Sequence, residues 1–425
     1  MIRAHVIGAG LSGLSAAVEL CSRGAEVVVY EAAPQAGGRC RSYFDAALDM
    51  EIDNGNHLVL SGNHATLAYA GRIGAREKLV GPGSATFPFI DLADGRRWTV
   101  RANDGLIPYW MLSRDRRVPD TRFREYLELA KLLRADAQAS IAGTLRCRGV
   151  LWQRLTEPFL VAALNIEAAA GSARLAAQVV RETLAAGGRN YHPLVARVGL
   201  SNALVRPALA YLEARGAQVL FGRRLRALAF EGERASALDF GDARVEIAPG
   251  DAVVMATPPQ ATGPLLPGVS VPTEFRAIVN AHYRVAPPPG LAAITGVVGG
   301  TAQWLFAFPE RLSVTISAGD ALLDTPREAL AERIWADVAR IAGLSGEPPR
   351  WQIVRERRAT FAASPAQDAL RPGAETAWRN VVLAGDWTQT GLPATIEGAI
   401  RSGVRAAAHV CGEKRRRLGF GAEAR

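Results

Sequence analysis

Three glycines near the start of the chain have the spacing of a site that binds a phosphate group. Gly8, Gly10 and Gly13 follow a short apolar run. The first glycine permits a tight turn, the second lets a pyrophosphate approach the backbone, and the third lets a helix and a strand pack closely. Free N–H groups and the helix dipole, at Leu11 and Ser12, favour negative charge at that point.

The elements that must hold this turn follow in the order strand, turn, helix and strand. An apolar strand is predicted at 2–7, a helix follows and ends at Gly24, and a second strand is predicted at 26–30. Glu31 comes 23 residues after Gly8, where a carboxylate can accept hydrogen bonds from ribose hydroxyls. The pattern predicts one half of a Rossmann-type dinucleotide-binding domain.

A second glycine turn narrows the choice of cofactor. Gly37, Gly38 and Arg39 are followed three residues later by Ser42. This Gly-Gly-Arg-x-x-Ser pattern resembles the flavoprotein superfamily of amine oxidases and carotenoid desaturases. The resemblance implies that FAD is the cofactor, that Arg39 reaches its phosphates, and that the two glycines let the backbone pass the flavin.

The other end of the chain carries a matching segment. A buried strand is predicted at 381–384, and Gly385 and Asp386 follow it. Pro393 then precedes a helix that begins near Thr395 and Ile396. This segment resembles the flavin-closing part of the same superfamily, which implies that Asp386 binds the ribityl or pyrophosphate region. The resemblance also implies that the positive end of the helix faces the flavin and stabilises its anionic reduced form.

The middle of the chain predicts a discontinuous domain arrangement. A helix at 201–215 and a strand at 251–257 resemble the superfamily's central cofactor-domain insert, in which Leu225 would meet the adenine through its backbone. We therefore expect an α/β fold with a Rossmann-type FAD-binding domain and a discontinuous mixed α+β substrate domain, as in amine oxidases and phytoene desaturases. The expected limits are 1–75, 198–260 and 376–412 for the FAD domain, 76–197 and 261–375 for the substrate domain, and 413–425 for a basic tail.

The first block of the substrate domain contains an amphipathic pattern flanked by arginines. Asp120 is expected to cap a helix, and basic residues cluster between Arg114 and Arg134. Such a helix either packs on a core with a solvated back or lies on a membrane. Its expected apolar positions are Phe123, Tyr126, Leu127, Ala130 and Leu133.

The second block predicts a strand and a helix. Apolar and polar residues alternate over 312–317, which is the period of a half-buried strand. A helix is expected from Thr325, with Pro326 at its first position and Glu328 completing a capping box, and it should stop at Gly343. The helix should bury Leu330, Ile334, Trp335 and Val338.

The segment Asp53-Asn54-Gly55-Asn56-His57 narrows the reaction. In carotenoid-desaturase-like enzymes the matching stretch runs past the flavin ring beside the substrate. The stretches 54–63, 163–167 and 193–201 further resemble the bacterial hydroxysqualene dehydroxylases. That resemblance implies the reduction of hydroxysqualene, an allylic C30 alcohol, to squalene and water by reduced FAD in hopanoid synthesis.

The implied chemistry requires an acid, because hydroxide is a poor leaving group. His57 is the first candidate and Asp53 the second, while Asn56 would hold the hydroxyl and Asn54 and Gly55 would lie against the cofactor. His57 could equally be a histidine that only fixes its loop. Water must be excluded as the allylic cation forms, which calls for a dry, apolar tunnel.

Other functions share most of these motifs. A carotenoid or phytoene desaturase would have nearly all of them, and a prenyl-protein escort would share the fold without redox chemistry. An amine oxidase is less favoured, since that group commonly uses a lysine near the flavin. Here lysine occurs only at Lys78, Lys131 and Lys414, and none of these lies in the strand block where it would be expected.

Composition limits the partners. The 425 residues are 49% hydrophobic and carry a formal net charge of +9, and 47 of the 50 basic residues are arginine. Without a nucleic-acid-binding signature, this charge indicates either an ordinary basic surface or a face for an anionic membrane. No apolar run reaches the ~18 residues of a spanning helix, and no metal site is predicted. Four scattered cysteines favour a reducing compartment. We expect a cytoplasmic protein bound peripherally to the inner face of the cytoplasmic membrane, and the sequence leaves its oligomeric state open.

Overall fold

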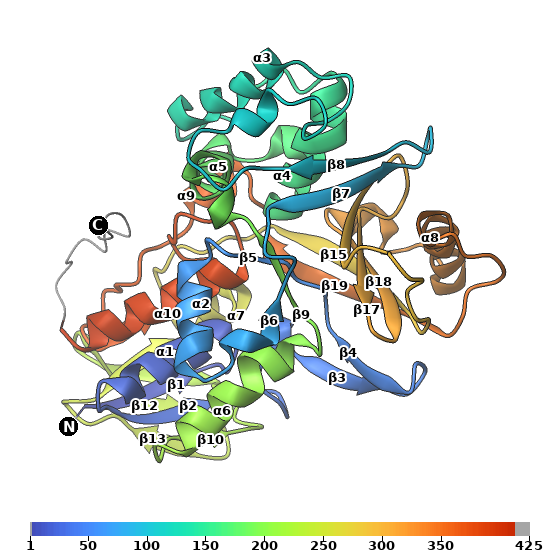
Figure 1. Cartoon of the computed structure of the whole chain (residues 1–425). Coiled ribbons are helices and arrows are strands. Elements are labelled where there is room, and N and C mark those ends of the chain that lie inside the picture. The colour runs from blue at the N-terminus through green and yellow to red at the C-terminus, as the bar shows by residue number, and fades with distance from the viewer. Residues whose placement is uncertain (1, 413–425) are drawn as a thin grey trace.

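The computed structural model describes residues 2–412 and contains two main sheets that lie side by side (Figure 1). The tail expected at 413–425 lies outside the described residues. The first sheet has five parallel strands. In spatial order they are β10 (Gln218–Leu220), β2 (Glu26–Tyr30), β1 (Arg3–Ile7), β14 (Ala252–Met255) and β20 (Val381–Leu383). All five lie in the ranges 1–75, 198–260 and 376–412.

Both faces of this sheet are buried, which explains why its strands are continuous apolar runs. In β2, Val27 and Val29 face one core, whereas Val28 and Tyr30 face the other. The first core also holds helices α1 (Leu11–Ser22), α2 (His64–Arg72), α6 (Arg206–Glu213) and α10 (Ile396–Val410). The second is covered by the antiparallel strands β11 (Ala227–Glu231), β12 (Arg234–Asp239) and β13 (Arg244–Glu246), together with a helical block.

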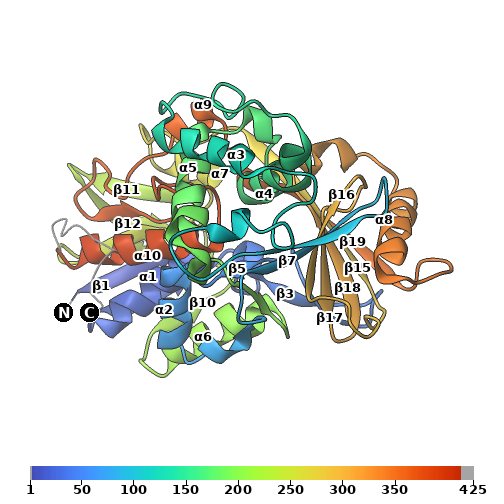
Figure 2. The same cartoon turned by 45° about the horizontal axis from the view of Figure 1, so that its top comes forward.

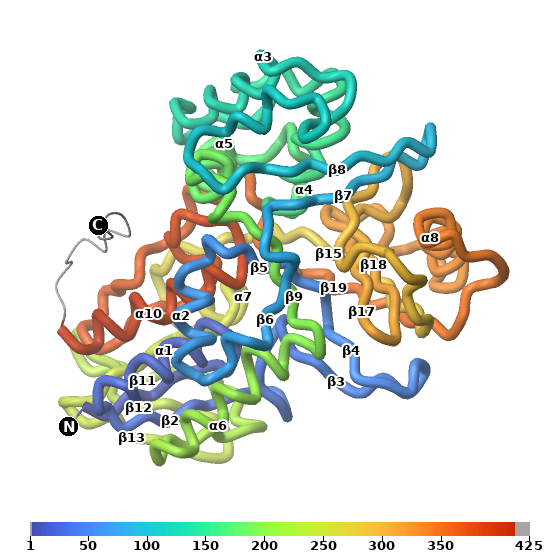
Figure 3. Tube along the Cα trace, in the orientation of Figure 1, coloured from blue at the N-terminus to red at the C-terminus, as the bar shows by residue number. Residues whose placement is uncertain are grey.

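Segments from the two ends of the chain pack directly on each other. Figure 3 shows α1 near the blue end of the trace beside α10 near the red end. A Cβ atom on Gly403 would lie 2.1 Å from Oγ of Ser15 and 2.2 Å from the backbone O of Ser12, so only glycine allows the two helices to come this close. The first and last predicted segments therefore form one layer.

The second sheet has seven strands of mixed direction. In spatial order they are β19 (Trp351–Phe361), β15 (Phe275–Tyr283), β18 (Arg311–Ile316), β17 (Trp304–Phe308), β16 (Ile294–Val298), β7 (Thr86–Asp91) and β8 (Arg97–Arg101). Its strands lie in the ranges 76–197 and 261–375. Helix α8 (Arg327–Ala342) covers one face.

The prediction for α8 was correct in its core and wrong at its start. The four expected residues Leu330, Ile334, Trp335 and Val338 are buried, and the helix ends at Gly343 with a φ of 67°. The N-cap is Pro326, and no side chain caps the helix, so the capping box of Thr325 and Glu328 does not form. Because proline occupies the cap, the helix begins one residue later than expected.

The face of the second sheet opposite α8 is polar and still buried. In β15, Val279 and Ala281 face α8, so Asn280 and His282 point the other way. In β18, Leu312 and Val314 face α8 while Ser313 and Thr315 do not. The strand was expected to be half-buried, but Ser313 is fully buried because the segment 53–56 covers this face.

A helical block completes the substrate domain at the top of Figure 1, and Figure 2 shows it reaching over both sheets. It contains α3 (Phe123–Tyr126), a 3-10 segment (Leu127–Arg134), α4 (Glu157–Leu164) and α5 (Ala173–Glu182). The expected apolar face was correct in part. Tyr126 is buried and Phe123 and Leu133 are partly buried, whereas Leu127 and Ala130 are exposed and the buried leucines are Leu129 and Leu132. Asp120 does not cap α3, whose N-cap is Arg122; the carboxylate of Glu125 accepts from the backbone N–H of Arg122 (2.6 Å), and no side chain caps the helix.

Short elements link the two domains. Strands β3 (Ser42–Asp45) and β4 (Met50–Asp53) form a hairpin, and β9 (Pro193–Ala196) pairs with both β5 (Val59–Leu60) and β6 (Leu79–Val80). The helix expected at 201–215 is a π turn (Ser201–Val205) followed by α6. The remaining helices are α7 (Pro259–Leu265) and α9 (Pro365–Ala369). Within residues 2–412, no helix has the length and apolarity needed to cross a bilayer.

Candidate active site

The glycine turn between β1 and α1 is shaped for close approach. Gly8 has a φ of 108°, and a Cβ atom there would lie 2.7 Å from the backbone O of Ala256. A Cβ atom on Gly13 would lie 1.9 Å from the backbone O of Gly8, so the helix can pack on the turn only at a glycine. At Gly10, by contrast, no atom of the described chain comes within 4 Å of such a Cβ position. This leaves open space over the first N–H groups of α1, at Leu11 and Ser12.

Glu31 lies beside this turn, as predicted from its spacing. Its carboxylate accepts hydrogen bonds from the backbone N–H groups of Ala9 (2.6 Å) and Ala33 (2.8 Å). The backbone N–H of Arg223 donates to the backbone O of Glu31 (2.8 Å), which brings the segment leading to Leu225 to the same edge. Leu225 itself is buried in the second core of the parallel sheet.

The second glycine turn docks on the first. The backbone N–H of Gly37 donates to Ala9 O (2.8 Å), and Gly10 and Gly37 form an isolated bridge. Gly38 begins a short 3-10 turn that carries Arg39. The two glycine turns, which are more than twenty residues apart in the sequence, thus form one surface.

Arg39 connects this surface to the far end of the chain. Its Nη2 donates to Oδ1 of Asp386 at 2.8 Å, and its Nη1 donates to the backbone O of Ala359. The side chain of Asp386 is 7% exposed and that of Arg39 is 40% exposed. The guanidinium therefore keeps N–H groups available to an anionic ligand while its position is fixed.

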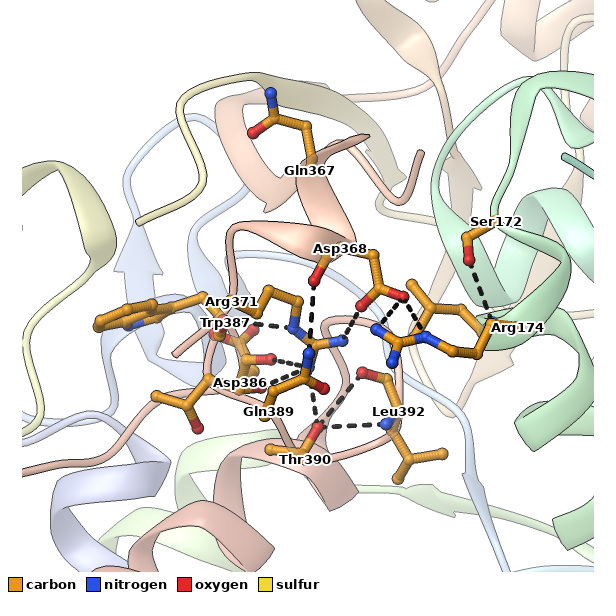
Figure 4. A network of polar contacts seen from close by, with 12 residues as sticks. Ser172, Arg174, Gln367, Asp368, Arg371, Asp386, Trp387, Gln389, Thr390 and Leu392 are labelled. Atoms are coloured by element: carbon orange, nitrogen blue, oxygen red, sulfur yellow. Dashed lines mark hydrogen bonds and ion pairs between the residues drawn. The ribbon is translucent and has the colours of Figure 1, made fainter. Parts of the chain in front are cut away.

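Arg371 holds the turn that carries Asp386 (Figure 4). This buried side chain donates to the backbone O atoms of Trp387 (3.3 Å) and Asp386 (3.2 Å) and to Oγ1 of Thr390 (3.0 Å). It also pairs with Oδ1 of Asp368 (3.0 Å). Gly385 fits under this turn because a Cβ atom there would lie 2.3 Å from Nε1 of Trp387.

The other oxygen of Asp368 connects the turn to the helical block. Oδ2 of Asp368 accepts from Nε (2.9 Å) and Nη2 (2.6 Å) of Arg174 on α5. Burial lowers the pKa of Arg371, and the charge of Asp368 offsets part of that effect. Asp368, which pairs with both Arg174 and Arg371, thus helps to fix the turn at 386–392.

The start of α10 lies next to the same turn. Oγ1 of Thr395 caps the helix by accepting from the backbone N–H of Gly398 (3.0 Å). Pro393 precedes this cap, and Ile396 packs into the first core of the parallel sheet. Glu397 accepts from the backbone N–H groups of Ala65 (3.0 Å) and Thr66 (2.8 Å) at the start of α2. The N-terminal ends of α2 and α10 are thereby joined.

The segment 54–57 runs over the polar face of the seven-stranded sheet. Nδ2 of Asn56 donates to Oγ1 of Thr315 (3.2 Å), which in turn donates to Oδ1 of Asn280 (2.8 Å). Gly55 permits the contact, since a Cβ atom there would lie 3.1 Å from Nδ2 of Asn280. Nδ2 of Asn54 donates to Oε2 of Glu356 (3.2 Å) on β19. Oδ1 of Asn56 is buried and has no hydrogen-bond partner within the described chain.

Asp53 is placed differently from its neighbours. Oδ1 accepts from Oγ of Ser42 (2.6 Å) and from the backbone N–H of Leu200 (2.8 Å), while Oδ2 lies 3.5 Å from Nη2 of Arg311. Burial raises the pKa of Asp53, and the two hydrogen bonds oppose that rise. Both oxygens therefore have partners in the protein, and the side chain joins β4 to the turn before α6 and to β18.

His57 is the first candidate for the acid that protonates the leaving group. Burial, and to a lesser degree the charge of Arg39, lowers the pKa of His57 to about 4. The ring is therefore neutral near pH 7, and its environment includes Arg39, the residue that binds Asp386. The structure thus brings His57, Asn56 and the cofactor segments together, while it directs Asp53 into the protein.

These features suit the FAD that the motifs imply. Gly10 leaves open space at the start of α1, where a pyrophosphate gains from the helix dipole and free N–H groups. Arg39 presents a partly exposed cation, and Asn56 presents an unpartnered buried oxygen. Within residues 2–412, no cluster of three or more His, Cys, Asp or Glu side chains is placed to hold a metal ion.

Sequence reasoning missed several residues that shape the site. Asn280 is the one amide in the apolar β15 run, and that break in the pattern is a signal of a special role. Thr315 belongs to the recognised alternation of β18, but the alternation does not say what covers its polar face. Arg371 and Glu356 had no local signal, because each acts through residues far away in the sequence.

Comparison with known proteins agrees with this geometry. Residues 11–411 match the family model described as flavin containing amine oxidoreductase. A hydroxysqualene dehydroxylase of Rhodopseudomonas palustris is 58% identical over 404 residues, which cover 95% of this chain and 97% of that protein. A probable zeta-carotene desaturase of Synechococcus elongatus is 24% identical over 486 residues, covering 96% of this chain and 98% of that protein.

The fold also matches a solved structure. A putative protoporphyrinogen oxidase from Exiguobacterium superposes with a TM-score of 0.67 at 18% identity, covering 97% of this chain and 99% of that one. At this identity the likeness speaks for the fold alone. The expected α/β class, with a Rossmann-type domain and a discontinuous mixed domain, is confirmed.

Proposed function

From the premise that this chain belongs to the flavin-containing amine oxidoreductase family, and within it to the hydroxysqualene dehydroxylases, we propose that it reduces hydroxysqualene to squalene and water with FAD as its cofactor. The observation that carries this proposal is the 58% identity to a hydroxysqualene dehydroxylase over 95% of the chain. The zeta-carotene desaturase match, at 24%, is far weaker.

We propose that the two ends of the chain hold the cofactor. The turn of Gly8, Gly10 and Gly13 with the start of α1 at Leu11 and Ser12 would bind the pyrophosphate, and Glu31 would bind a ribose. Gly37, Gly38 and Arg39, with Asp386, would line the phosphates and ribityl chain. The remaining proposed contacts are Asn54, Gly55, Leu225, Gly385, Pro393, Thr395 and Ile396.

We propose that His57 and Asn56 act on the substrate hydroxyl. Reduced FAD, when bound, supplies the hydride that replaces this hydroxyl on the allylic carbon. Asn56 would hold the hydroxyl through its unpartnered Oδ1, which can accept the O–H hydrogen. His57 would take a proton from solvent and pass it to the departing oxygen, which leaves as water.

Asp53 is proposed to hold the segment that carries Asn56 and His57 in place. Its partners Ser42, Leu200 and Arg311 use both carboxylate oxygens, so we propose that it positions the segment 54–57 and that His57 is the proton donor. The polar sheet face at Asn280 and Thr315 holds the same segment from the other side.

The experiment that tests the reaction is an anaerobic single turnover. Protein with photoreduced FAD is mixed with hydroxysqualene in detergent micelles, and squalene is measured by gas chromatography. We expect one squalene per flavin reoxidised. Desaturation of phytoene in a parallel incubation with oxidised protein, without squalene formation, would favour a desaturase, and a colourless protein that binds no FAD would favour an escort.

The substrate also determines where the enzyme works. A C30 hydrocarbon alcohol has almost no solubility in water, so it must reach the site from a bilayer. We therefore propose a cytoplasmic protein that binds peripherally to the inner face of the cytoplasmic membrane. We also retain as a proposal the domain limits given above, with the FAD domain closed by the two ends of the chain.

A further inference from the structure

One loop of the helical block exposes an unusual concentration of large apolar side chains. Leu106, Ile107, Tyr109 and Leu112 are 72%, 77%, 53% and 60% exposed. With Leu127, they make up five of the eleven large hydrophobic side chains that are exposed within residues 2–412. Isolated apolar residues on a surface are ordinary, but a contiguous group marks a contact site. We call residues 105–112 the docking loop.

The docking loop is held in shape from inside. Buried Asn103 donates through Nδ2 to the backbone O of Ile107 (2.9 Å), and its Oδ1 accepts from the backbone N–H of Trp110 (3.2 Å). Trp110 and Met111 are buried and anchor the end of the loop. The hydrogen bonds of Asn103 and the buried residues Trp110 and Met111 therefore hold the apolar side chains in an exposed position, although burying these side chains would remove their surface from water.

The surroundings of the loop are basic. Residues 106–127 contain five arginines and three acidic residues, a net charge of +2. Arg114, Arg122 and Arg124 are exposed among them, as are Asp115 and Asp120, so the exposed charges sum to +1. Apolar and aromatic side chains beside arginines suit the interface of an anionic bilayer, where the apolar groups enter the acyl boundary and the cations meet headgroups.

The loop is also connected to the candidate active site. Oδ1 of Asp104 lies 2.8 Å from Nε2 of His192, and the backbone N–H of Arg189 donates to Asp104 O (3.2 Å). The segment that follows His192 is β9, in which Leu194 pairs with Val59, two residues from His57. Beside this route, Phe87 stacks on Tyr191 with ring centroids 6.5 Å apart. Polar contacts at Asp104 and the strand β9 thus link the start of the loop to the strand next to His57.

We propose that the docking loop inserts Leu106, Ile107, Tyr109 and Leu112 into the surface of an anionic phospholipid bilayer, so that the lipid substrate enters the protein beside it. This rests on the proposed function, because it gives the route by which a C30 substrate would leave the membrane. For the helix at 123–133, where the sequence left core packing and membrane binding open, burial of Tyr126, Leu129 and Leu132 supports core packing.

The test uses FAD-loaded protein and vesicles of phosphatidylcholine with 30% phosphatidylglycerol, at low salt. The variant Leu106→Ser/Ile107→Ser should reduce the vesicle-bound fraction measured by sedimentation, with a partition coefficient lowered about tenfold or more. Phe44→Ser is the matched control, because Phe44 is 65% exposed on β3, away from the loop. The control should bind as the parent does, and all three proteins should keep the same FAD content and melting temperature.

Activity assays separate this proposal from the proposed function. In detergent micelles the double variant should convert hydroxysqualene at the parent rate, whereas with substrate in vesicles its turnover should fall. A parent inactive in micelles would contradict the proposed function but leave the binding result intact. Equal vesicle binding by parent and double variant would overturn the docking loop. So would a parent that binds no vesicles and forms a dimer that the double variant does not, since the loop would then bind a second copy.

Discussion

Arg39 and Asp386 lie 347 positions apart in the chain and are joined by a hydrogen bond of 2.8 Å from Nη2 to Oδ1. The contact joins the Gly-Gly-Arg turn to the turn after β20, which are two segments expected to bind one cofactor. Asp386 is itself fixed by Arg371 through its backbone O. The proposed cofactor surface is thus assembled by protein contacts alone, and we expect FAD binding to require little rearrangement of these segments.

Substitution of Arg39 should weaken FAD binding more than it weakens the fold. Arg39→Ala removes a partly exposed cation and leaves the buried carboxylate of Asp386 without its partner. A hydrogen bond to a charged group contributes about 1.5–3 kcal/mol, which corresponds to roughly a 10- to 150-fold loss of affinity. Fluorescence quenching of FAD titrated into apoprotein measures this. Arg41→Ala is the control, since the side chain of half-buried Arg41 donates to the backbone O of Gly38 in its own turn, and equal losses in both variants would contradict the assignment.

The substitution Arg371→Lys should destabilise the protein and reduce FAD binding, although it keeps the positive charge. In Arg371→Lys a single ammonium with three N–H groups replaces a planar group that reaches five acceptors. Each buried backbone oxygen left without a donor costs about 1–3 kcal/mol, so urea unfolding should shift to lower concentration. The purified variant should also contain less FAD per protein, and excess FAD should restore part of the stability.

The control for this change is Arg379→Lys. Arg379 pairs with Glu233 on the surface, where both side chains are mostly exposed. Surface pairs contribute about 0–1 kcal/mol, so this variant should unfold and bind FAD as the parent does. Loss of stability in Arg371→Lys with a full FAD content would show that Arg371 does not position the cofactor turn.

The parts of the fold that could be predicted are those encoded locally. The spacing of Gly8, Gly10 and Gly13 predicts a tight turn and a closely packed helix. Glu31 is placed by the length of the helix and strand that follow this turn. The buried residues of α8 follow from helical periodicity alone. Two local signals competed at Thr325 and Pro326, and in the structure Pro326 is the N-cap.

The parts that could not be predicted depend on contacts between distant segments. The alternation in β18 correctly predicts that Thr315 and Leu312 lie on opposite faces, but not that Asn56 covers one of them. Asp53 looked like a candidate acid because its motif lies beside a flavin in related enzymes. The hydrogen bond from Leu200, 147 positions later, turns its carboxylate into the protein instead.

Acid should destabilise the protein through His282. Burial, with a smaller effect from the charge of Arg311, lowers the pKa of His282 to about 3, against about 6.5 in an unfolded chain. Between these values the unfolded chain binds a proton that the folded protein does not. Stability from this group is complete above pH 6.5 and is lost as the pH falls toward 3, by up to about 1.4 kcal/mol per pH unit.

Urea unfolding at several pH values between 7 and 4 measures this loss. In His282→Gln the free energy of unfolding should fall less steeply with decreasing pH, whereas the control His64→Gln, at an exposed position, should keep the parent slope. If the free energy of unfolding falls equally steeply with decreasing pH in His282→Gln and in the parent, the imidazole of His282 is not the group that destabilises the protein in acid.

The pH dependence of turnover should identify the role of His57. Since the pKa of His57 is lowered to about 4, its protonated fraction falls about tenfold for each pH unit above that value. If the imidazolium protonates the departing hydroxyl, kcat/KM in detergent micelles should decrease with rising pH between about 5 and 8, with a slope near −1. His57→Gln keeps a hydrogen-bonding side chain but does not titrate, so its rate should be low and independent of pH over the same range. FAD content, read from the flavin absorbance, should match the parent in this variant. A parent profile that is flat, or a slope of −1 that survives in His57→Gln, would assign the proton transfer to another group.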